Sequence, residues 1–198
     1  TPDFMKNQTL AAILALAVTA STLPAQQAAP AKHPSPPEVW KDYNPDAGDF
    51  KEEIISEETK DGVYYKDSYI SAYVNGEEIR VFCKYAVKAG AKNAPGLLNI
   101  HGWYAPTRLD MDFVNDGWAQ LAFDYCGKRP DRPHYTKYPK TLIYGNMDQG
   151  TANPEGYKPI DPNQITKPSQ TADYLWSAIQ RRALSYFLTQ KEVDKTRI

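Results

Sequence analysis

Residues 96–103, Gly-Leu-Leu-Asn-Ile-His-Gly-Trp, decide the fold, because a short apolar run ends in a turn that contains glycine. Such a run is typical of a strand buried on both faces of a sheet. A second apolar run, Ala119 to Tyr125, ends the same way at Gly127. Residues 107–115, between the two runs, predict a brief helix. Buried strands joined by a helix predict parallel pairing with a right-handed crossover.

A hairpin is predicted upstream of these strands. Residues 69–74 are strand-like, Asn75-Gly76 is the strongest short hairpin signal, and residues 78–87 alternate between apolar and polar positions. This part of the sheet should therefore be antiparallel.

A long helix is predicted downstream, with Ser169 or Thr171 as its cap. Its apolar residues recur at spacings of three and four, which predicts packing on the sheet, with Arg181 and Arg182 on the other side. The apolar positions are Ala172, Leu175, Trp176, Ile179, Ala183, Tyr186 and Phe187. Residues 193–198 then begin another apolar run, interpreted as the first step of a further buried strand.

These segments in this order resemble the α/β-hydrolase superfamily, in the branch of secreted acetyl xylan esterases, cephalosporin-C deacetylase-like enzymes and dienelactone hydrolase relatives. Residues 98–103 look like the family's strand and His-Gly-X oxyanion turn, and residues 121–127 look like its next strand and turn. Residues 183–198 resemble the lead-in to the nucleophile. The resemblance covers about residues 64–198 and implies the N-terminal half of the fold, an α/β domain cut before the nucleophile elbow.

The resemblance implies a Ser-His-Asp triad, with the serine in a Gly-x-Ser-x-Gly turn followed along the chain by the acid and the histidine. No serine of this sequence has glycines at those offsets. No catalytic triad residue is therefore expected within the chain, which should be inactive alone. The triad is expected after Ile198.

What the resemblance does assign here is half of an oxyanion hole. The backbone N–H of Trp103 is the implied donor, with Tyr104 as the neighbouring candidate. Backbone donors aimed at a developing oxyanion lower the barrier of acyl transfer. The usual His-Gly-Gly-Gly is replaced by His-Gly-Trp-Tyr, which suggests that Trp103 also walls the acyl pocket.

The long irregular insertion, residues 127–168, leaves the sheet where open α/β sheets place ligands. Its tyrosines suggest stacking on an acylated sugar, or alternatively rings that pin a proline-rich loop to the surface. The candidate substrate-binding residues are Tyr135, Tyr138 and Tyr144, bordered by Tyr157, Arg129, Arg132 and His134.

His101 and Asp124 are better interpreted as structural than as catalytic residues. A histidine between a buried strand and a glycine usually forms hydrogen bonds that stabilise the turn, and Asp124 is suited to stabilising its own turn. His33 and His134 lie in unrelated contexts, so no metal site is predicted. The implied chemistry needs no cofactor.

The beginning of the chain predicts export. Met5 opens a short polar segment that leads into an eleven-residue apolar run, residues 10–20, too short to cross a bilayer. We assign residues 5–25 to a signal peptide, 26–62 to a proline-rich tether (disordered over 26–37) and lead-in, and 63–198 to the partial catalytic domain. Localisation is then secreted or periplasmic, with no stable membrane anchor.

Composition excludes a nucleic-acid partner, since 23 basic and 24 acidic residues give a net charge of −1. Cys83 and Cys126 are the only cysteines. In an exported protein they could form a disulfide, although two buried thiols are the favoured alternative.

The sequence thus predicts a fragment of a secreted serine hydrolase that cleaves carboxylic esters, of the acetyl xylan esterase type. The expected partner is an acylated carbohydrate or another ester. A prolyl-oligopeptidase-like peptidase is one alternative, disfavoured because no large domain precedes the predicted strands. A non-catalytic glycan-binding module on the same scaffold is the other.

Overall fold

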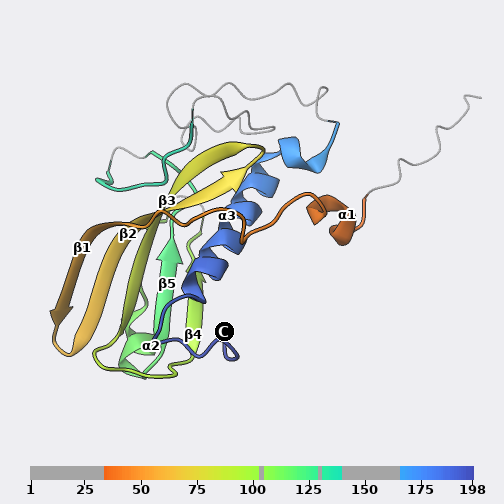
Figure 1. The fold of residues 1–198 in the computed structure, drawn as a ribbon. Coiled ribbons are helices and arrows are strands. Elements are labelled where there is room, and N and C mark those ends of the chain that lie inside the picture. The colour runs from red at the N-terminus through yellow and green to blue at the C-terminus, as the bar shows by residue number, and fades with distance from the viewer. Residues whose placement is uncertain (1–33, 103–104, 129–130, 140–165) are drawn as a thin grey trace, which may run out of the picture. The chain divides into compact units, whose positions relative to one another are not determined.

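A mixed sheet of five strands forms the centre of the protein in a computed structural model that describes residues 34–102, 105–128, 131–139 and 166–198 (Figure 1). The strands are β1 (Glu53–Lys60), β2 (Val63–Val74), β3 (Glu77–Lys88), β4 (Gly96–Ile100) and β5 (Ala119–Phe123). Their order across the sheet is β1-β2-β3-β5-β4. Neighbouring strands pair antiparallel from β1 to β5, whereas β5 and β4 are parallel. The predicted α/β arrangement is present over the described residues.

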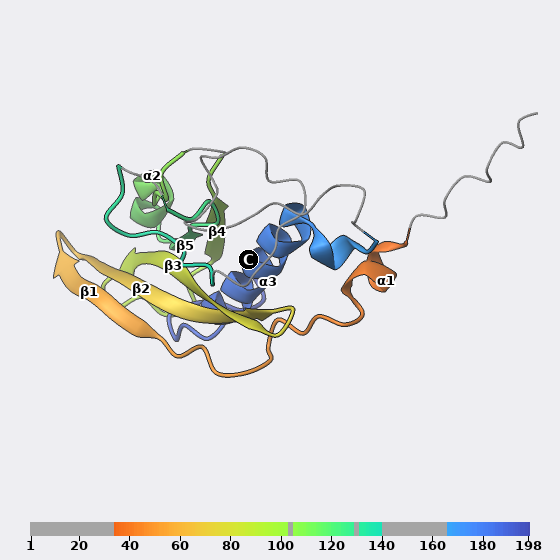
Figure 2. The ribbon, with the colours of Figure 1, turned by 90° about the horizontal axis from the view of Figure 1, so that it is seen from above.

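Helices lie on both faces of this sheet (Figure 2). The long helix α3 (Ala172–Phe187) packs against β2, β3, β5 and β4, and α2 (Met111–Asn115) contacts β3 and β5. On β3, Tyr85 and Val87 belong to the core under α3, while Ala86 packs with Val114 of α2. Because side chains alternate along a strand, the two helices cover opposite faces.

The predicted hairpin forms around Asn75 and Gly76. Both have positive φ angles, 52° and 82°, as a type I′ turn requires. β2 and β3 then pair over their full lengths, from Val74 opposite Glu77 to Val63 opposite Lys88.

Thr171 caps α3, since its hydroxyl accepts a hydrogen bond from the backbone N–H of Tyr174. A short 3₁₀ turn, η2 (Pro168–Gln170), precedes it. The other predicted cap, Ser169, lies within η2.

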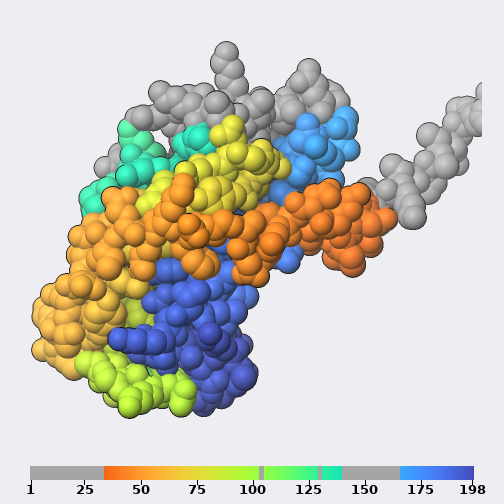
Figure 3. Space-filling model, viewed as in Figure 1, coloured from red at the N-terminus to blue at the C-terminus, as the bar shows by residue number. Residues whose placement is uncertain are grey.

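The compact unit that contains the sheet begins at Ser35, upstream of residue 63, at which the domain was predicted to start. It includes helix α1 (Pro36–Trp40), whose first residues fall in the segment predicted to be disordered, and the charged edge strand β1. Contacts with α3 hold this lead-in: Trp40 stacks on Tyr174 at 4.5 Å, and the Tyr43 hydroxyl donates to the Ala178 carbonyl. Figure 3 shows the lead-in, in orange, crossing over α3, in blue.

Arg182 corrects one prediction. Its side chain, expected on the solvent side of the helix, is 1% exposed. The guanidinium donates to the carbonyls of Ser71, Pro45 and Gly48 at 2.7–2.8 Å, so β2 and the lead-in together supply the acceptors that burial requires.

β4 is less buried than its apolar sequence predicts. Leu97, Leu98 and Asn99 are half-buried, and Ile100 is 44% exposed. Among the described residues, the outer edge of β4 is covered only at its start, where residues 192–197 run alongside. There the Gly96 N–H donates to the Arg197 carbonyl, and Ala94 forms a parallel bridge with Val193.

Cys83 and Cys126 are both buried and no disulfide joins them, as favoured. Burial raises the pKa of the Cys83 thiol above its usual range.

In the part of the chain that the structure describes, no helix is long and apolar enough to cross a membrane. The predicted signal peptide lies outside the described residues.

Candidate functional site

The candidate site lies at the carboxyl ends of β4 and β5. Because the two strands are parallel neighbours, with Ile100 opposite Phe123, the turns that follow them meet at one edge of the sheet. His101 and Gly102 follow β4, and Asp124 follows β5. This is the edge at which open α/β sheets bind ligands.

Asp124 stabilises its own turn, as predicted. Its carboxylate is buried and accepts hydrogen bonds from the backbone N–H groups of Cys126 (3.2 Å), Gly127 (3.1 Å) and Thr136 (2.7 Å). The Thr136 hydroxyl donates to the Asp124 carbonyl. Asp124 therefore ties the start of the long insertion to the end of β5, a task that leaves its carboxylate poorly placed for proton transfer.

His101 is held between the two turns. Its Nδ1 lies 2.9 Å from the Gly102 carbonyl oxygen, and its Nε2 lies 3.4 Å from Oδ1 of Asp124 without hydrogen-bond geometry. The ring stacks on Tyr125, with centroids 4.5 Å apart and planes 10° apart. These contacts support the structural interpretation of His101 over a role as general base.

A histidine, a carboxylate and a thiol lie close together here. The ligand atoms of His101, Asp124 and Cys126 lie within 4.8 Å of one another, a grouping that sequence spacing did not suggest. Such ligands suit zinc. However, Asp124 already accepts three backbone N–H groups, and Arg132 Nη1 lies 3.9 Å from its Oδ1. The positive guanidinium opposes a second cation at this carboxylate.

A pocket of about 190 Å³ opens beside these turns. It lies between the ends of β4 and β5 and the first turns of α3. The lining residues are Ile100, Phe123, Tyr125, Asp173, Trp176, Ser177 and Gln180. Tyr125 and Trp176 contact each other with ring centroids 5.5 Å apart. The pocket is small and largely apolar in lining.

The predicted site residues are only partly described. Trp103, Tyr104 and Tyr144 lie outside the described residues, as do Arg129 and Tyr157.

Of the described tyrosines, Tyr135 is half-buried and Tyr138 is 9% exposed. The Tyr138 hydroxyl donates to the Tyr125 carbonyl at 2.6 Å. Tyr138 thus fits the alternative of a ring that pins the loop.

His134 lies away from the pocket. It stacks on Phe82 with centroids 5.5 Å apart and meets Tyr69 edge-on. The neighbours of these two residues, Ile70 and Cys83, belong to the core under α3, so Tyr69 and Phe82 point to the opposite face of the sheet. The Arg132 side chain, in contrast, is 9% exposed and lies near Asp124. The structure therefore brings Arg132, but not His134, to the edge where His101 lies.

Sequence reasoning missed Tyr125, Trp176 and Thr136. Trp176 was assigned to the core face of its helix, and no motif distinguishes it there from a packing residue. Thr136 sits in a segment without periodicity, so no pattern pointed to its partner, Asp124.

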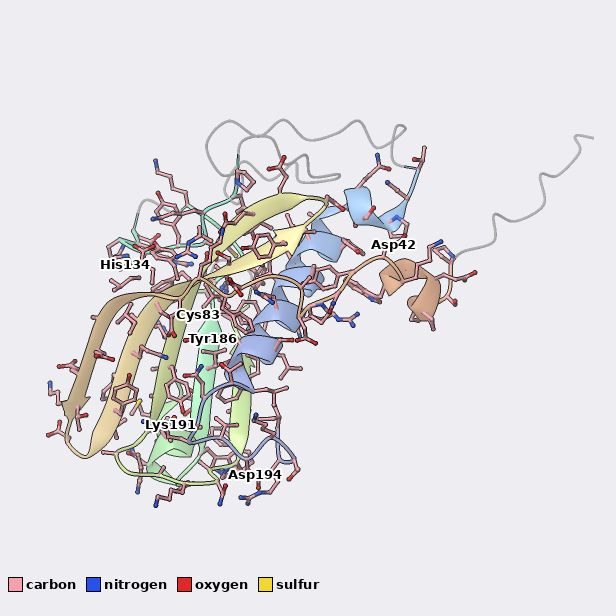
Figure 4. All side chains as sticks on the ribbon, in the orientation of Figure 1. Asp42, Cys83, His134, Tyr186, Lys191 and Asp194 are labelled. Carbon is pink, nitrogen blue, oxygen red and sulfur yellow. The ribbon has the colours of Figure 1, made fainter. Side chains whose placement is uncertain are left out.

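A larger hollow of about 560 Å³ lies at the other end of α3, near Lys191 and Tyr186 (Figure 4). Within it, Lys66 is buried and paired with Glu52 at 2.7 Å and with Gln190 at 3.0 Å. Tyr186 donates to the same Glu52 carboxylate, and burial raises the pKa of its hydroxyl. The charges satisfy one another, so we interpret this network as structural despite the size of the hollow.

No protein-family model matches the chain, and no curated protein matches its sequence. Solved structures with a similar fold include two acetyl xylan esterases. The enzyme from Paenibacillus sp. R4 has a TM-score of 0.53 and 20% identity, over 78% of this chain and 46% of that one. Acetyl xylan esterase 1 from Thermoanaerobacterium sp. JW/SL YS485 has a TM-score of 0.54 and 16% identity, over 75% and 43%. The chain thus has an esterase-like α/β fold and spans less than half of either enzyme.

Proposed function

We propose that this chain is the N-terminal part of a longer, exported serine hydrolase that cleaves carboxylic esters, most specifically acetyl groups on carbohydrate. One observation carries the proposal. An antiparallel hairpin leads into the parallel pair β5–β4, with their turns and a small apolar pocket at one edge, and acetyl xylan esterases share this fold. The coverage of less than half of each esterase supports a longer protein.

The proposed mechanism is acyl transfer through a Ser-His-Asp triad supplied by sequence beyond Ile198. This chain contributes the backbone N–H of Trp103 as an oxyanion donor, with Tyr104 as the neighbouring candidate. One such donor is worth about 3–4 kcal/mol of transition-state stabilisation. Tyr125 and Trp176 wall the pocket for the acyl group.

Two experiments test the proposal. Reading the gene beyond Ile198 should reveal Gly-x-Ser-x-Gly within about thirty codons, since the elbow follows the next strand. The longer protein should then hydrolyse p-nitrophenyl acetate, release acetate from acetylated xylan, and react with a fluorophosphonate probe. Replacing the elbow serine by alanine should abolish all three.

The outcomes separate the alternatives. Binding of acetylated xylan without hydrolysis or labelling would indicate the glycan-binding module. Cleavage of prolyl peptides with no release of acetate would indicate the peptidase.

A further inference from the structure

The hollow near Lys191 lies at the end of the sheet away from the candidate site (Figure 4). Residues 189–192 form one side of it, and at their end the Ala94 N–H, just before β4, donates to the Glu192 carbonyl at 2.8 Å. The candidate site lies beside Ile100, at the other end of β4. At about 3.3 Å per residue, residues 94–100 separate the two by about 20 Å. The hollow is therefore distinct from the pocket assigned to the acyl group.

The buried part of the hollow is held rigid by paired groups. The Lys66 side chain is 8% exposed and lies 2.7 Å from Glu52 and 3.0 Å from Gln190. Its ammonium group also lies over the rings of Tyr85 and Tyr186. Because these groups satisfy one another, they fix the shape of the hollow and leave contacts with a ligand to the residues around them.

Tyr64 supplies an aromatic surface in the hollow. It lies on the sheet face that α3 packs on, since its cross-strand partner Val87 belongs to the core under α3. The Tyr64 hydroxyl donates to Glu57 at 2.9 Å, and the ring meets Tyr85 edge-on with centroids 6.4 Å apart. Tyr64 is only half-buried. A sugar can stack the C–H groups of its ring on such a surface.

The lining is polar and nearly balanced in charge. Its carboxylates belong to Glu52 and Glu192, and its ammonium groups belong to Lys66, Lys88 and Lys191. Threonine hydroxyls and a glutamine amide also line it. This mixture provides both donors and acceptors, which the hydroxyl groups of a sugar need.

Other ligand classes fit the hollow less well. Its carboxylates would repel a phosphate-rich ligand. Val87 and Ala89 are the only aliphatic residues in the described lining, too few to bury an apolar side chain of a peptide. The volume of about 560 Å³ is within the range of about 300–1,000 Å³ that small-molecule sites occupy.

We propose that this hollow is a second carbohydrate-binding site, which holds one part of a polysaccharide on Tyr64 while another part reaches the candidate active site. Holding the polymer raises the effective concentration of its acetyl groups at the active site. Its contribution to hydrolysis rests on the proposed function, whereas its binding of sugar does not.

The test compares variants of the longer protein. Tyr64→Leu removes the aromatic ring but keeps an apolar side chain beside Tyr85, and Tyr64→Phe keeps the ring. Thr59→Trp adds bulk to the hollow from an exposed position of β1. Tyr65→Leu is the control, because Tyr65 packs near Val114 on the opposite face of the sheet.

Retardation in native gels that contain soluble xylan gives an apparent Kd. We expect this Kd to rise about five- to tenfold in Tyr64→Leu and in Thr59→Trp, and to stay within about twofold in Tyr64→Phe and Tyr65→Leu. The KM for acetylated xylan should rise with it. In Thr59→Trp, kcat/KM for p-nitrophenyl acetate and the melting temperature should match those of the wild type.

The outcomes separate the two proposals. A wild-type protein that xylan does not retain, or a Thr59→Trp variant retained as strongly as the wild type, would overturn the second site. Equal losses on xylan and on p-nitrophenyl acetate would overturn it as well. If xylan retains the proteins as expected but none of them hydrolyses p-nitrophenyl acetate, the proposed function fails and the carbohydrate-binding site stands.

Discussion

At the scale of single residues, Arg182 shows how a charge can be buried with backbone carbonyls as its hydrogen-bond acceptors. Its three acceptors are backbone carbonyls, and its guanidinium lies 3.9 Å from the centre of the Phe50 ring. Arg181, its neighbour in sequence, lies over the Trp40 ring and remains partly exposed. The pair therefore offers matched variants at adjacent positions.

Arg182→Leu should lower the free energy of unfolding of the longer protein by about 3–5 kcal/mol, because three buried carbonyls lose their donor. Arg181→Leu is the control and should cost about 1 kcal/mol or less. Denaturant unfolding followed by tyrosine and tryptophan fluorescence measures both. Equal losses in the two variants would contradict the role assigned to the buried guanidinium.

At the scale of elements, β4 and α3 pack closely together at Gly96. A Cβ atom on Gly96 would lie 2.8 Å from Cε1 of Phe187 and closer still to Cδ1 of Ile198. Gly96→Ala should therefore cost about 1–3 kcal/mol of stability. Adding Phe187→Leu opens space, so the double variant should lose less than the sum of the single losses. Strict additivity in denaturant unfolding would show that the contact does not limit packing.

The attachment of the lead-in to α3 predicts a dependence on alkaline pH. Burial is the main cause that raises the pKa of Tyr43 from 10.0 to about 12, and its hydroxyl donates to the Ala178 carbonyl. A pKa raised by folding contributes stability that is complete below about pH 10 and is lost as the pH rises to about 12. Tyr43→Phe should be less stable at neutral pH and lose stability less steeply over this window.

Stability measured at several alkaline pH values tests this. Burial also raises the pKa of Tyr64 to about 12. The free energy of unfolding of Tyr43→Phe should therefore still fall somewhat as the pH rises. If the free energy of unfolding of Tyr43→Phe falls with pH as steeply as that of the wild type, Tyr43 does not contribute to the loss of stability at alkaline pH.

At the scale of the whole molecule, the edge of β4 limits how this chain behaves alone. Among the residues that the structure describes, only those beside the start of the strand pair with it on its outer side, and Ile100 is 44% exposed. An unprotected apolar edge is a template for pairing between molecules. Residues 26–198 expressed alone should therefore self-associate in light scattering, and Ile100→Lys should reduce this. A monomer with a sharp, reversible melting transition would refute the prediction.

Much of this architecture could be predicted from local patterns. The turn at Asn75-Gly76, the apolar runs of β4 and β5 and the periodicity of α3 all lie within short windows, and each element formed there. β1 was missed because its charged sequence has no apolar alternation, and it gains its place only by pairing with β2. The burial of Arg182 depends on carbonyls more than 100 residues away, which no local pattern reports.

The hydrogen bonds from Arg182 to these distant carbonyls also affect the order in which the protein can fold during synthesis. Pro45 leaves the ribosome 137 residues before Arg182 does. At usual translation speeds that interval is on the order of ten seconds. For that time Trp40 and Tyr43 have no helix to dock on, so the lead-in stays undocked until α3 has been synthesised.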